Sequence, residues 1–398
     1  MNPPVSDAGG LRSLLWNGHM SEGFDTYLRS RGVVLAEMEP GVVTPLRFTV
    51  PSQEHQATRR WAGLFDFSFM SCFQIGGPEA RPFLERLQTR NLARLQPGRF
   101  LYTLLLREDG TVHVDATVWD LGQGRYWIIT GRRKDLGHLE RVATGMDVVI
   151  EDRSGRDAVF ALQGPASHEI LGELLEDEAL PLRYFGFRPT RLCGVPVLVA
   201  RAGYSGEAGY EILTDSARAL SVWRHLADAR RPGEVVECGL ECIDSLRVEA
   251  GLILFARELG WRLTPETLGL ARLVDASGVP VFLGATALRR QQASRRASVK
   301  LVGLMPQRGS IPAPDPPPAA NAVPEILPGR ALVTSRIDSP IWGHDLGLGL
   351  VRMEDAWSGT RVTATNGARM VVARLPFYDP AKRLPRASAA LPVGHGSR

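Results

Sequence analysis

The chain has 398 residues, of which 44% are hydrophobic and 23% are charged, and its formal net charge at pH 7 is +4. This composition is typical of a globular protein with two or three domains. The small net charge gives no support for a nucleic-acid partner, and four cysteines are too few for a disulfide framework, so we expect a reducing, cytoplasmic setting.

Several classes of site and segment are not expected. No apolar run approaches the about 18 residues of a membrane helix, and the N-terminus lacks the pattern of a signal peptide. Cys238 and Cys242 lie four residues apart, but no second pair of ligands accompanies them, so we expect no metal site. Phosphate-loop and dinucleotide fingerprints are absent, which argues against a bound flavin or nicotinamide.

The first part of the chain is predicted to be loose over residues 1–40, because proline and glycine accumulate near its beginning. Order begins near Val42. A helical stretch is predicted at 54–62. The segment AGLFDFSFM at 62–70 follows it, and a strand is predicted at 72–75. A Gly-Gly-Pro turn leads from this strand into an amphipathic helix.

Residues 104–119 predict a β-hairpin with an Asp-Gly turn at 109–110, because glycine adopts the positive φ that a tight reversal requires. The apolar residues of its second strand recur with period two, namely Val112, Val114, Ala116 and Val118. The opposite face carries Asp115 between His113 and Trp119. Such a face is ordinarily exposed to solvent, but a carboxylate on a rigid strand could also be aimed into a pocket, where it orients or transfers a proton.

A glycine-rich loop, GYSGEAGYE at 203–211, joins two further predicted strands. On pattern alone, Glu207 and Glu211 would be surface charges around a hairpin. The alternative is a ligand site, because glycines let a backbone pass close to a bound molecule.

The second half of the chain begins with two predicted helices, at 216–230 and 239–251. Residues 311–328 are rich in proline and alanine and predict a stiff, exposed loop. Strand patterns resume after this loop, and the tail beyond Pro380 is predicted to be disordered.

Taken together, these motifs resemble the glycine cleavage T-protein family, the tetrahydrofolate-dependent aminomethyltransferases. The resemblance rests on AGLFD at 62–66, GTVHVD at 110–115, GYSGEAGYE at 203–211, D-x-x-R-x-E-A-G at 244–251 and PFY at 376–378. The motifs occur in the family's order from about residue 50 to residue 380. The resemblance therefore covers most of the chain.

The fold that this resemblance implies is α+β: mixed sheets with packed helices, followed by a small C-terminal β-barrel. We expect a loose segment at 1–40 and two folate-binding subdomains at 41–300 that divide near 150. A linker at 301–330, the barrel at 331–380 and a disordered tail at 381–398 would follow.

The resemblance also implies a site for tetrahydrofolate. Asp115 would be the catalytic residue, which contacts the N5/N10 region of the folate and assists proton transfer. Glu211 would accept the N–H groups of the pterin through charge-assisted hydrogen bonds. The complete set of residues expected to bind the cofactor is Met70, Tyr102, Tyr204, Glu211 and Arg247. His113 and Trp119 share the face of Asp115 and could contact the donor.

Three departures from the family pattern bear on the one-carbon donor. Val114 replaces an aspartate, Ile243 replaces an arginine that reaches the folate tail, and Arg272 replaces an aromatic residue. They favour an aminomethyl or methyl transferase that acts on a small-molecule donor, as in demethylase relatives. The alternatives are a T-protein proper, which acts on a lipoyl carrier protein, and a non-enzymatic folate-binding factor. Basic runs at 132–134 and 289–290 are interpreted as solvated charge rather than as a site for the folate tail.

Overall fold

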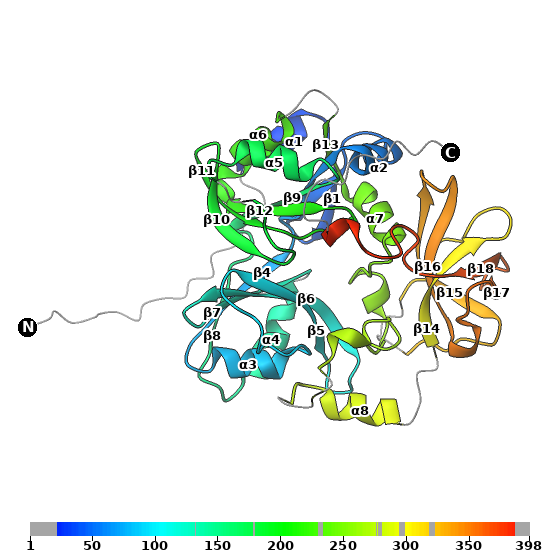
Figure 1. Ribbon diagram of the computed structural model, residues 1–398. Coiled ribbons are helices and arrows are strands. Elements are labelled where there is room, and N and C mark those ends of the chain that lie inside the picture. Colours follow the sequence, from blue (N-terminus) through cyan, green and yellow to red (C-terminus); the bar gives the residue numbers. More distant parts are fainter. Residues whose placement is uncertain are drawn as a thin grey trace, which may run out of the picture.

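The computed structural model describes residues 22–131, 133–177, 180–229, 234–275, 277, 281–293, 299–317 and 323–386. Three β assemblies surround the helix α7 (Leu240–Glu249): a six-stranded sheet, a five-stranded sheet and a closed barrel (Figure 1). The predicted α+β class, with a barrel at the C-terminal end, is confirmed.

The six-stranded sheet has the spatial order β10-β11-β12-β9-β3-β13, and only the pairing of β13 with β3 is parallel. Its strands are β3 (Ala62–Asp66), β9 (Asp157–Gln163), β10 (Phe187–Leu192), β11 (Val195–Ala200), β12 (Gly209–Asp215) and β13 (Val235–Cys238). Three helices pack on its outer side: α1 (Glu22–Ser30), α5 (Ser167–Leu174) and α6 (Ala219–Ala227).

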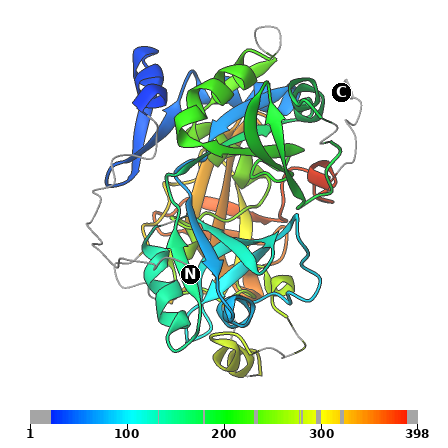
Figure 2. The same cartoon turned by 90° about the vertical axis from the view of Figure 1, so that its left-hand side faces the viewer.

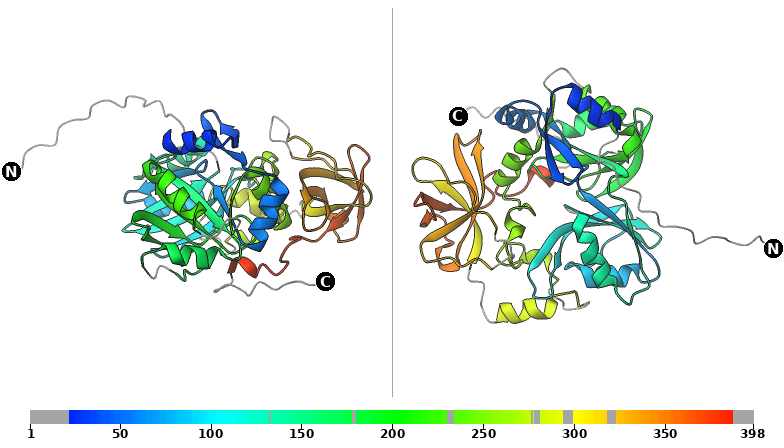
Figure 3. Two further views of the ribbon diagram at one scale, coloured as in Figure 1. Left: turned by 90° about the horizontal axis from the view of Figure 1, so that it is seen from above. Right: turned by 180° about the vertical axis from the view of Figure 1, so that it is seen from behind.

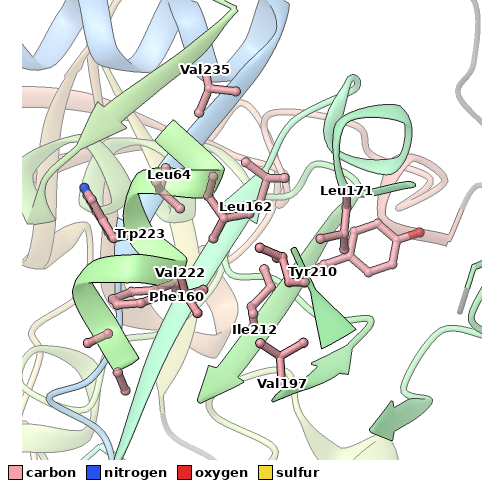
Figure 4. Close-up of a cluster of buried hydrophobic side chains, with 14 of the residues drawn as sticks. Leu64, Phe160, Leu162, Leu171, Val197, Tyr210, Ile212, Val222, Trp223 and Val235 are labelled. Atoms are coloured by element: carbon pink, nitrogen blue, oxygen red, sulfur yellow. The ribbon is translucent and has the colours of Figure 1, made fainter. Parts of the chain in front are cut away.

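The two faces of this sheet bury different sets of side chains. The outer core, beneath the helices, includes Leu64, Phe160, Leu162, Tyr210, Ile212 and Trp223 (Figure 4). On the inner face, Val159, Ala161 and Leu213 belong to another buried cluster. Because side chains alternate along a strand, Glu211 shares the inner face with Leu213.

The five-stranded sheet has the order β5-β6-β7-β4-β8. Its strands are β4 (Ser71–Gly76), β5 (Arg99–Leu106), β6 (Val112–Gly122), β7 (Arg125–Thr130) and β8 (Val149–Asp152), and α3 (Ala80–Leu87) and α4 (Leu136–Ala143) cover one face. The predicted hairpin is confirmed: Gly110 has a φ of 80°, and the alternating apolar residues of β6 are buried.

The division near residue 150 is only partly right. The five-stranded sheet ends at β8, but the chain has already contributed β3 to the six-stranded sheet before it enters the five-stranded one. The parallel pairing of β3 with β13 joins residues far apart in sequence. Local patterns cannot reveal such a pairing.

Helix α7 lies in the middle of the molecule and is buried on nearly every side. It packs against α2 (Pro51–Arg60), against β2 (Val42–Arg47) and against two barrel strands, β15 (Arg330–Ser339) and β16 (His344–Arg352). A helix buried all round carries no single apolar stripe. Its polar side chains must therefore find partners inside the protein.

The barrel begins earlier than predicted. β14 (Val299–Pro306) closes it by pairing with β16 and with β18 (Arg369–Ala373), and β17 (Arg361–Ala364) completes it. The predicted exposed loop begins with Ile311, which is fully buried in the barrel core. The Asp315 carboxylate accepts a hydrogen bond from the Val333 N–H at 2.8 Å, so this segment is packed on the barrel. Helix α8 (Ala285–Ala293) precedes the barrel.

The N-terminal segment also differs from the prediction. Residues 1–21 lie outside the described residues, but α1 and the hairpin of β1 (Val34–Glu39) and β2 follow at once (Figures 2 and 3). Phe24 and Leu28, one helical turn apart, are 1% and 0% exposed. Their burial against the outer core holds α1 on the sheet. In the predicted disordered tail, residues 381–386 adopt a defined turn, and 387–398 are not among the described residues.

Across the described residues, no helix combines the length and apolar character needed to cross a membrane.

Candidate active site

Tyr102 and Asp115 form a hydrogen-bonded pair on adjacent strands of the five-stranded sheet. The Tyr102 hydroxyl donates to Oδ2 of Asp115 at 2.9 Å. Burial, and then the charge of Asp115, raise the pKa of Tyr102 well above its usual value. The phenol therefore stays protonated at neutral pH and acts as a donor that orients the carboxylate.

Tyr204 reaches the same place from the glycine-rich loop. Its hydroxyl donates to the carbonyl of Ile253. Burial raises its pKa well above the usual value, and the charge of Asp115 adds to this effect. Tyr102 and Tyr204 also interact electrostatically. The structure thus brings together three predicted site residues from three separate segments.

Glu211 lies on the inner face of β12, opposite Ala161 on β9 and Ala200 on β11. These small apolar neighbours offer its carboxylate no hydrogen bond, and none to any other described residue is present. Burial raises the pKa of Glu211 to about 7. Glu211 is half-buried, so its carboxylate is available to a molecule that brings a hydrogen-bond donor.

Tyr184 is a further buried tyrosine near Glu211, and the sequence interpretation missed it. Burial raises the pKa of Tyr184, and the negative charge of Glu211 contributes. The Tyr184 ring stacks on Phe185, with ring centres 4.2 Å apart. Nothing in the local sequence pattern distinguishes Tyr184 from a packing residue.

Met70 lies on the loop between β3 and β4 and is half-buried. It packs on the same apolar cluster as Tyr204 and Ile243. Ile243, at the position of the family's arginine, is 5% exposed. Ile243 therefore puts a buried apolar side chain at the position where the family pattern would place a cation.

Arg247 is completely buried, and all five of its N–H groups have partners. Nε and one terminal nitrogen contact Asp244, at 2.8 and 2.7 Å. The remaining donors reach the Leu252 carbonyl at 3.1 Å, Glu258 at 3.1 Å and Ser335 of β15 at 2.7 Å. Arg247 has no donor left for the cofactor contact predicted from the sequence. We interpret it instead as a positioning residue that joins α7 to the barrel behind Tyr204.

Neither of the two residues expected to face the donor is available for it. Trp119 is 1% exposed and stacks on Phe100, with ring centres 4.2 Å apart, so this expectation is wrong. His113 is engaged with Asp135 at 2.9 Å and stacks on His138, on the side where α4 begins. Both side chains serve packing and pairing inside the sheet.

Close packing inside the protein explains why glycine occupies positions 203 and 209 of the 203–211 loop. A Cβ on Gly203 or Gly209 would lie within 2.0 or 2.3 Å of the Gln163 side chain. The close approach inferred from these glycines is therefore to Gln163, not to a ligand. Glu207 of the same loop is also not a surface charge, because it is buried and bonds Arg59 at 3.0 Å.

Arg59 belongs to a buried network that the sequence did not suggest. It bonds Glu249 of α7 at 2.8 Å, and its guanidinium lies 3.8 Å from the ring centre of Tyr378. Tyr378 in turn donates its backbone N–H to the Glu249 carbonyl at 2.8 Å. The PFY motif therefore anchors the chain after the barrel to α2 and α7.

One buried group has the composition of a metal site, namely Glu54 with Cys238 and Cys242. The Glu54 carboxylate already accepts hydrogen bonds from the backbone N–H groups of Phe48, Thr49 and Gly239, at 2.7–2.9 Å. Burial raises the pKa of Cys238 well above its usual value, which favours the thiol over the thiolate that a metal needs. This group fits a structural role.

Known proteins resemble this chain over most of its length. The family model described as GCVT N-terminal domain matches residues 25–278. An aminomethyltransferase of Streptomyces coelicolor is 33% identical over 366 residues, which cover 89% of this chain and 96% of that protein. An aminomethyltransferase of Bacillus subtilis is 33% identical over 343 residues, with coverages of 84% and 92%.

The fold has a solved counterpart in glycine cleavage system aminomethyltransferase T from Bartonella henselae. The two chains superpose with a TM-score of 0.75 and 26% identity, over 90% of this chain and 97% of the other. The names of these relatives give no support to the expected demethylase-like reaction on a small molecule. They accord better with the alternative that the sequence left open, an aminomethyltransferase proper.

Proposed function

Because this chain belongs to the aminomethyltransferase (GCVT) family and is an enzyme of that transferase type, we propose that it transfers the one-carbon unit of an aminomethyl group from a lipoyl carrier protein to tetrahydrofolate, with release of ammonia and the lipoyl thiol. The observation that carries the proposal is the combination of an oriented carboxylate, Asp115, with an unpartnered one, Glu211. Asp115 is suited to accept a proton. Glu211 is suited to bind a molecule that presents hydrogen-bond donors along one edge.

The residues present fit a reduced pterin. A pterin offers adjacent N–H groups along one edge, and a carboxylate can accept them in two charge-assisted bonds. Glu211 has the acceptor and lacks a donor, so a pterin would satisfy it. The aromatic side chain of Tyr204 and the thioether of Met70, which pack on the same cluster, would bind the flat ring.

The protein itself has to position the reacting groups and handle one proton. Bound tetrahydrofolate supplies a nucleophilic nitrogen for the one-carbon unit. Asp115 holds or accepts the proton that this nitrogen gives up, and Tyr102 fixes the carboxylate by donating to Oδ2. Arg247 keeps α7 and the barrel in place behind Tyr204, so that the reacting groups meet in one orientation.

The donor is the part of the proposal that most needs an experiment. Purified protein would be mixed with tetrahydrofolate and one of two donors: a lipoyl carrier protein loaded with an aminomethyl group, or a set of small methylated amines, thioethers and aryl ethers. Ammonia and the lipoyl thiol would be measured. We expect both to appear only with the loaded carrier and only when tetrahydrofolate is present.

A transfer that occurs only from a small donor would contradict the proposed carrier-protein donor. It would support the small-molecule donor expected from the sequence. Absence of transfer from either donor, in protein that still binds tetrahydrofolate, would also contradict the proposal.

A further inference from the structure

Arg59 of α2 joins the glycine-rich loop at 203–211 to the centre of the protein. One terminal nitrogen of its guanidinium donates to the Ser205 carbonyl at 2.8 Å and to the Glu207 carboxylate at 3.0 Å. The other terminal nitrogen donates to the Glu249 carboxylate of α7 at 2.8 Å. The Arg59 side chain is 7% exposed, so these bonds form away from bulk solvent. A single side chain thus connects the loop with α2 and α7.

The loop residue next to this contact is Tyr204, which belongs to the candidate active site. Its hydroxyl donates to the Ile253 carbonyl, just beyond the end of α7. Arg59 holds the backbone at Ser205, one residue after Tyr204, and the Ile253 carbonyl holds the far end of the Tyr204 side chain. A shift of the Ser205 carbonyl would therefore move the Tyr204 ring, because the two residues are adjacent in the chain.

The loop is close-packed on both sides of this contact. Gly206 has a φ of 81°, and a Cβ at this position would lie 2.7 Å from the Cβ of Ala250 at the end of α7. On the other side, the Ser205 hydroxyl donates to Oε1 of Gln163 at 2.8 Å. The bonds from Arg59 therefore act on a segment that has one close-packed position, which defines where Tyr204 lies.

The segment that follows the barrel covers Arg59. The guanidinium of Arg59 lies 3.8 Å from the ring centre of Tyr378, and such a contact is strengthened by exclusion of water. The Tyr378 N–H donates to the Glu249 carbonyl at 2.8 Å, and the Ser339 hydroxyl of β15 donates to the Glu249 carboxylate at 2.5 Å. The barrel and the chain after it thus help to place the arginine that holds the loop.

Arg247, the other internal arginine of this region, is arranged differently. Its hydrogen bonds go to α7 itself, to the stretch that follows α7, and to β15, through Asp244, Leu252, Glu258 and Ser335. Of the two arginines, Arg59 is the one that bonds the loop of Tyr204 directly.

We infer that Arg59 is a positioning residue for the binding of the pterin. By holding the Ser205 carbonyl and Glu207 against α7, it sets the place of the Tyr204 ring on which the pterin packs. The inference rests on the proposed function, since Tyr204 binds the flat ring there. Arg59 acts only through Tyr204, so its loss should weaken the binding of every pterin alike.

The test variant is Arg59→Lys. Lysine keeps the positive charge beside Glu249, but one ammonium cannot reproduce the planar fork that reaches both Ser205 and Glu249. The matched control is Arg60→Lys, at the next position of the same helix, where the side chain is exposed. Each change is made in the wild type and in Tyr204→Ala. A second variant, Tyr378→Leu, leaves Arg59 in place and removes the ring above it. Thermal unfolding would show that each variant is folded.

The first measurement is calorimetric titration of the full chain with tetrahydrofolate, without oxygen. We expect Arg59→Lys to weaken binding about 10-fold in the wild type and less than about 2-fold in Tyr204→Ala, because the two residues act through one contact. Tyr378→Leu should weaken binding about 3-fold, and Arg60→Lys should leave it unchanged. Equal losses from Arg59→Lys in both backgrounds, or no loss in the wild type, would overturn the inference.

The second measurement needs no ligand. Hydrogen exchange of the backbone amides at 203–211 should be about 10-fold faster in Arg59→Lys than in Arg60→Lys, whereas the hairpin at 104–119 should exchange alike in both. A loop that exchanges as slowly as in the wild type would also contradict the role of Arg59. If the wild type bound no tetrahydrofolate, the proposed function would fail, and the exchange of the loop would still decide whether Arg59 holds it.

Discussion

The buried charges of this protein fall into two groups that differ in how they are paired. Around α7, Arg247 meets Asp244 and Glu258, and Arg59 meets Glu207 and Glu249. Every one of these groups has an oppositely charged neighbour. On the inner face of β12, Glu211 has no oppositely charged neighbour among the described residues.

The paired charges stabilise the fold, whereas an unpaired charge is available to bind a ligand. A buried ion needs a partner, because its desolvation otherwise costs several kcal/mol. The paired groups find that partner within the chain and join α2, α7 and the barrel into one body. Glu211 bears part of this cost in the ligand-free protein, and a bound molecule with hydrogen-bond donors would offset it. Asp115 belongs to neither group, because it accepts a hydrogen bond from the Tyr102 hydroxyl inside the candidate site.

Substitution of Asp115 is the strongest way to test its place in this scheme. Asp115→Asn keeps the shape and the bond from Tyr102 but removes the proton acceptor. We expect turnover to fall by about 10²–10⁴ while the affinity for tetrahydrofolate stays near that of the wild type. The control is Asp120→Asn on the same strand, whose carboxylate only caps the Gly122 N–H at 2.8 Å. A rate for Asp115→Asn close to that of the wild type would remove Asp115 from the chemistry.

Breaking a paired group should affect stability rather than ligand specificity. Arg247→Met leaves Glu258 buried without its cation, and we expect the free energy of unfolding in urea to fall by about 3–5 kcal/mol. Arg352→Met is the matched control, because the Arg352–Glu354 pair is exposed and contributes about 1 kcal/mol at most. A loss of less than about 1 kcal/mol for Arg247→Met would contradict the architectural role.

The parts of this structure that sequence predicts are those with a local cause. The alternation of Val112, Val114 and Val118 and the turn at Gly110 define the hairpin without any long-range information. The barrel and the candidate residues Asp115, Tyr204 and Glu211 came from resemblance, which carries spatial information that the patterns lack.

The parts that the sequence could not predict depend on contacts between distant segments. In a helical pattern Arg247 looks like any surface charge, and only the barrel strand β15 shows that it is buried. Trp119 stands at an alternating polar position, yet the facing sheet covers it. Lys382 lay in a tail that composition marks as disordered, and hydrogen bonds to Asp379 give it a fixed place.

The unpaired group on β12 should respond to substitution in its binding of ligand. Glu211→Gln loses one of the charge-assisted acceptors, and we expect tetrahydrofolate to bind about 10- to 100-fold more weakly. Since the pKa of Glu211 is about 7, the wild type should also lose affinity about tenfold per pH unit below pH 7. The Gln variant should lack this slope, as titrations at pH 5.5, 6.5 and 7.5 would show. Equal slopes in both proteins would assign the titration to another group.

Glu211→Gln should raise the free energy of unfolding of the ligand-free protein, whereas Arg247→Met should lower it. The pKa of Glu211 in the folded state, about 7, lies above its ordinary value of 4.5, so folding favours the protonated form. Stability from this group is therefore full below about pH 4.5 and is lost as the pH rises through 7. Glu211→Gln should stabilise the ligand-free protein by about 1–3 kcal/mol at pH 8, relative to its effect at pH 4.5. Urea unfolding at the two pH values measures this difference, and a destabilised Gln variant at pH 8 would mean that Glu211 has a partner in the folded protein after all.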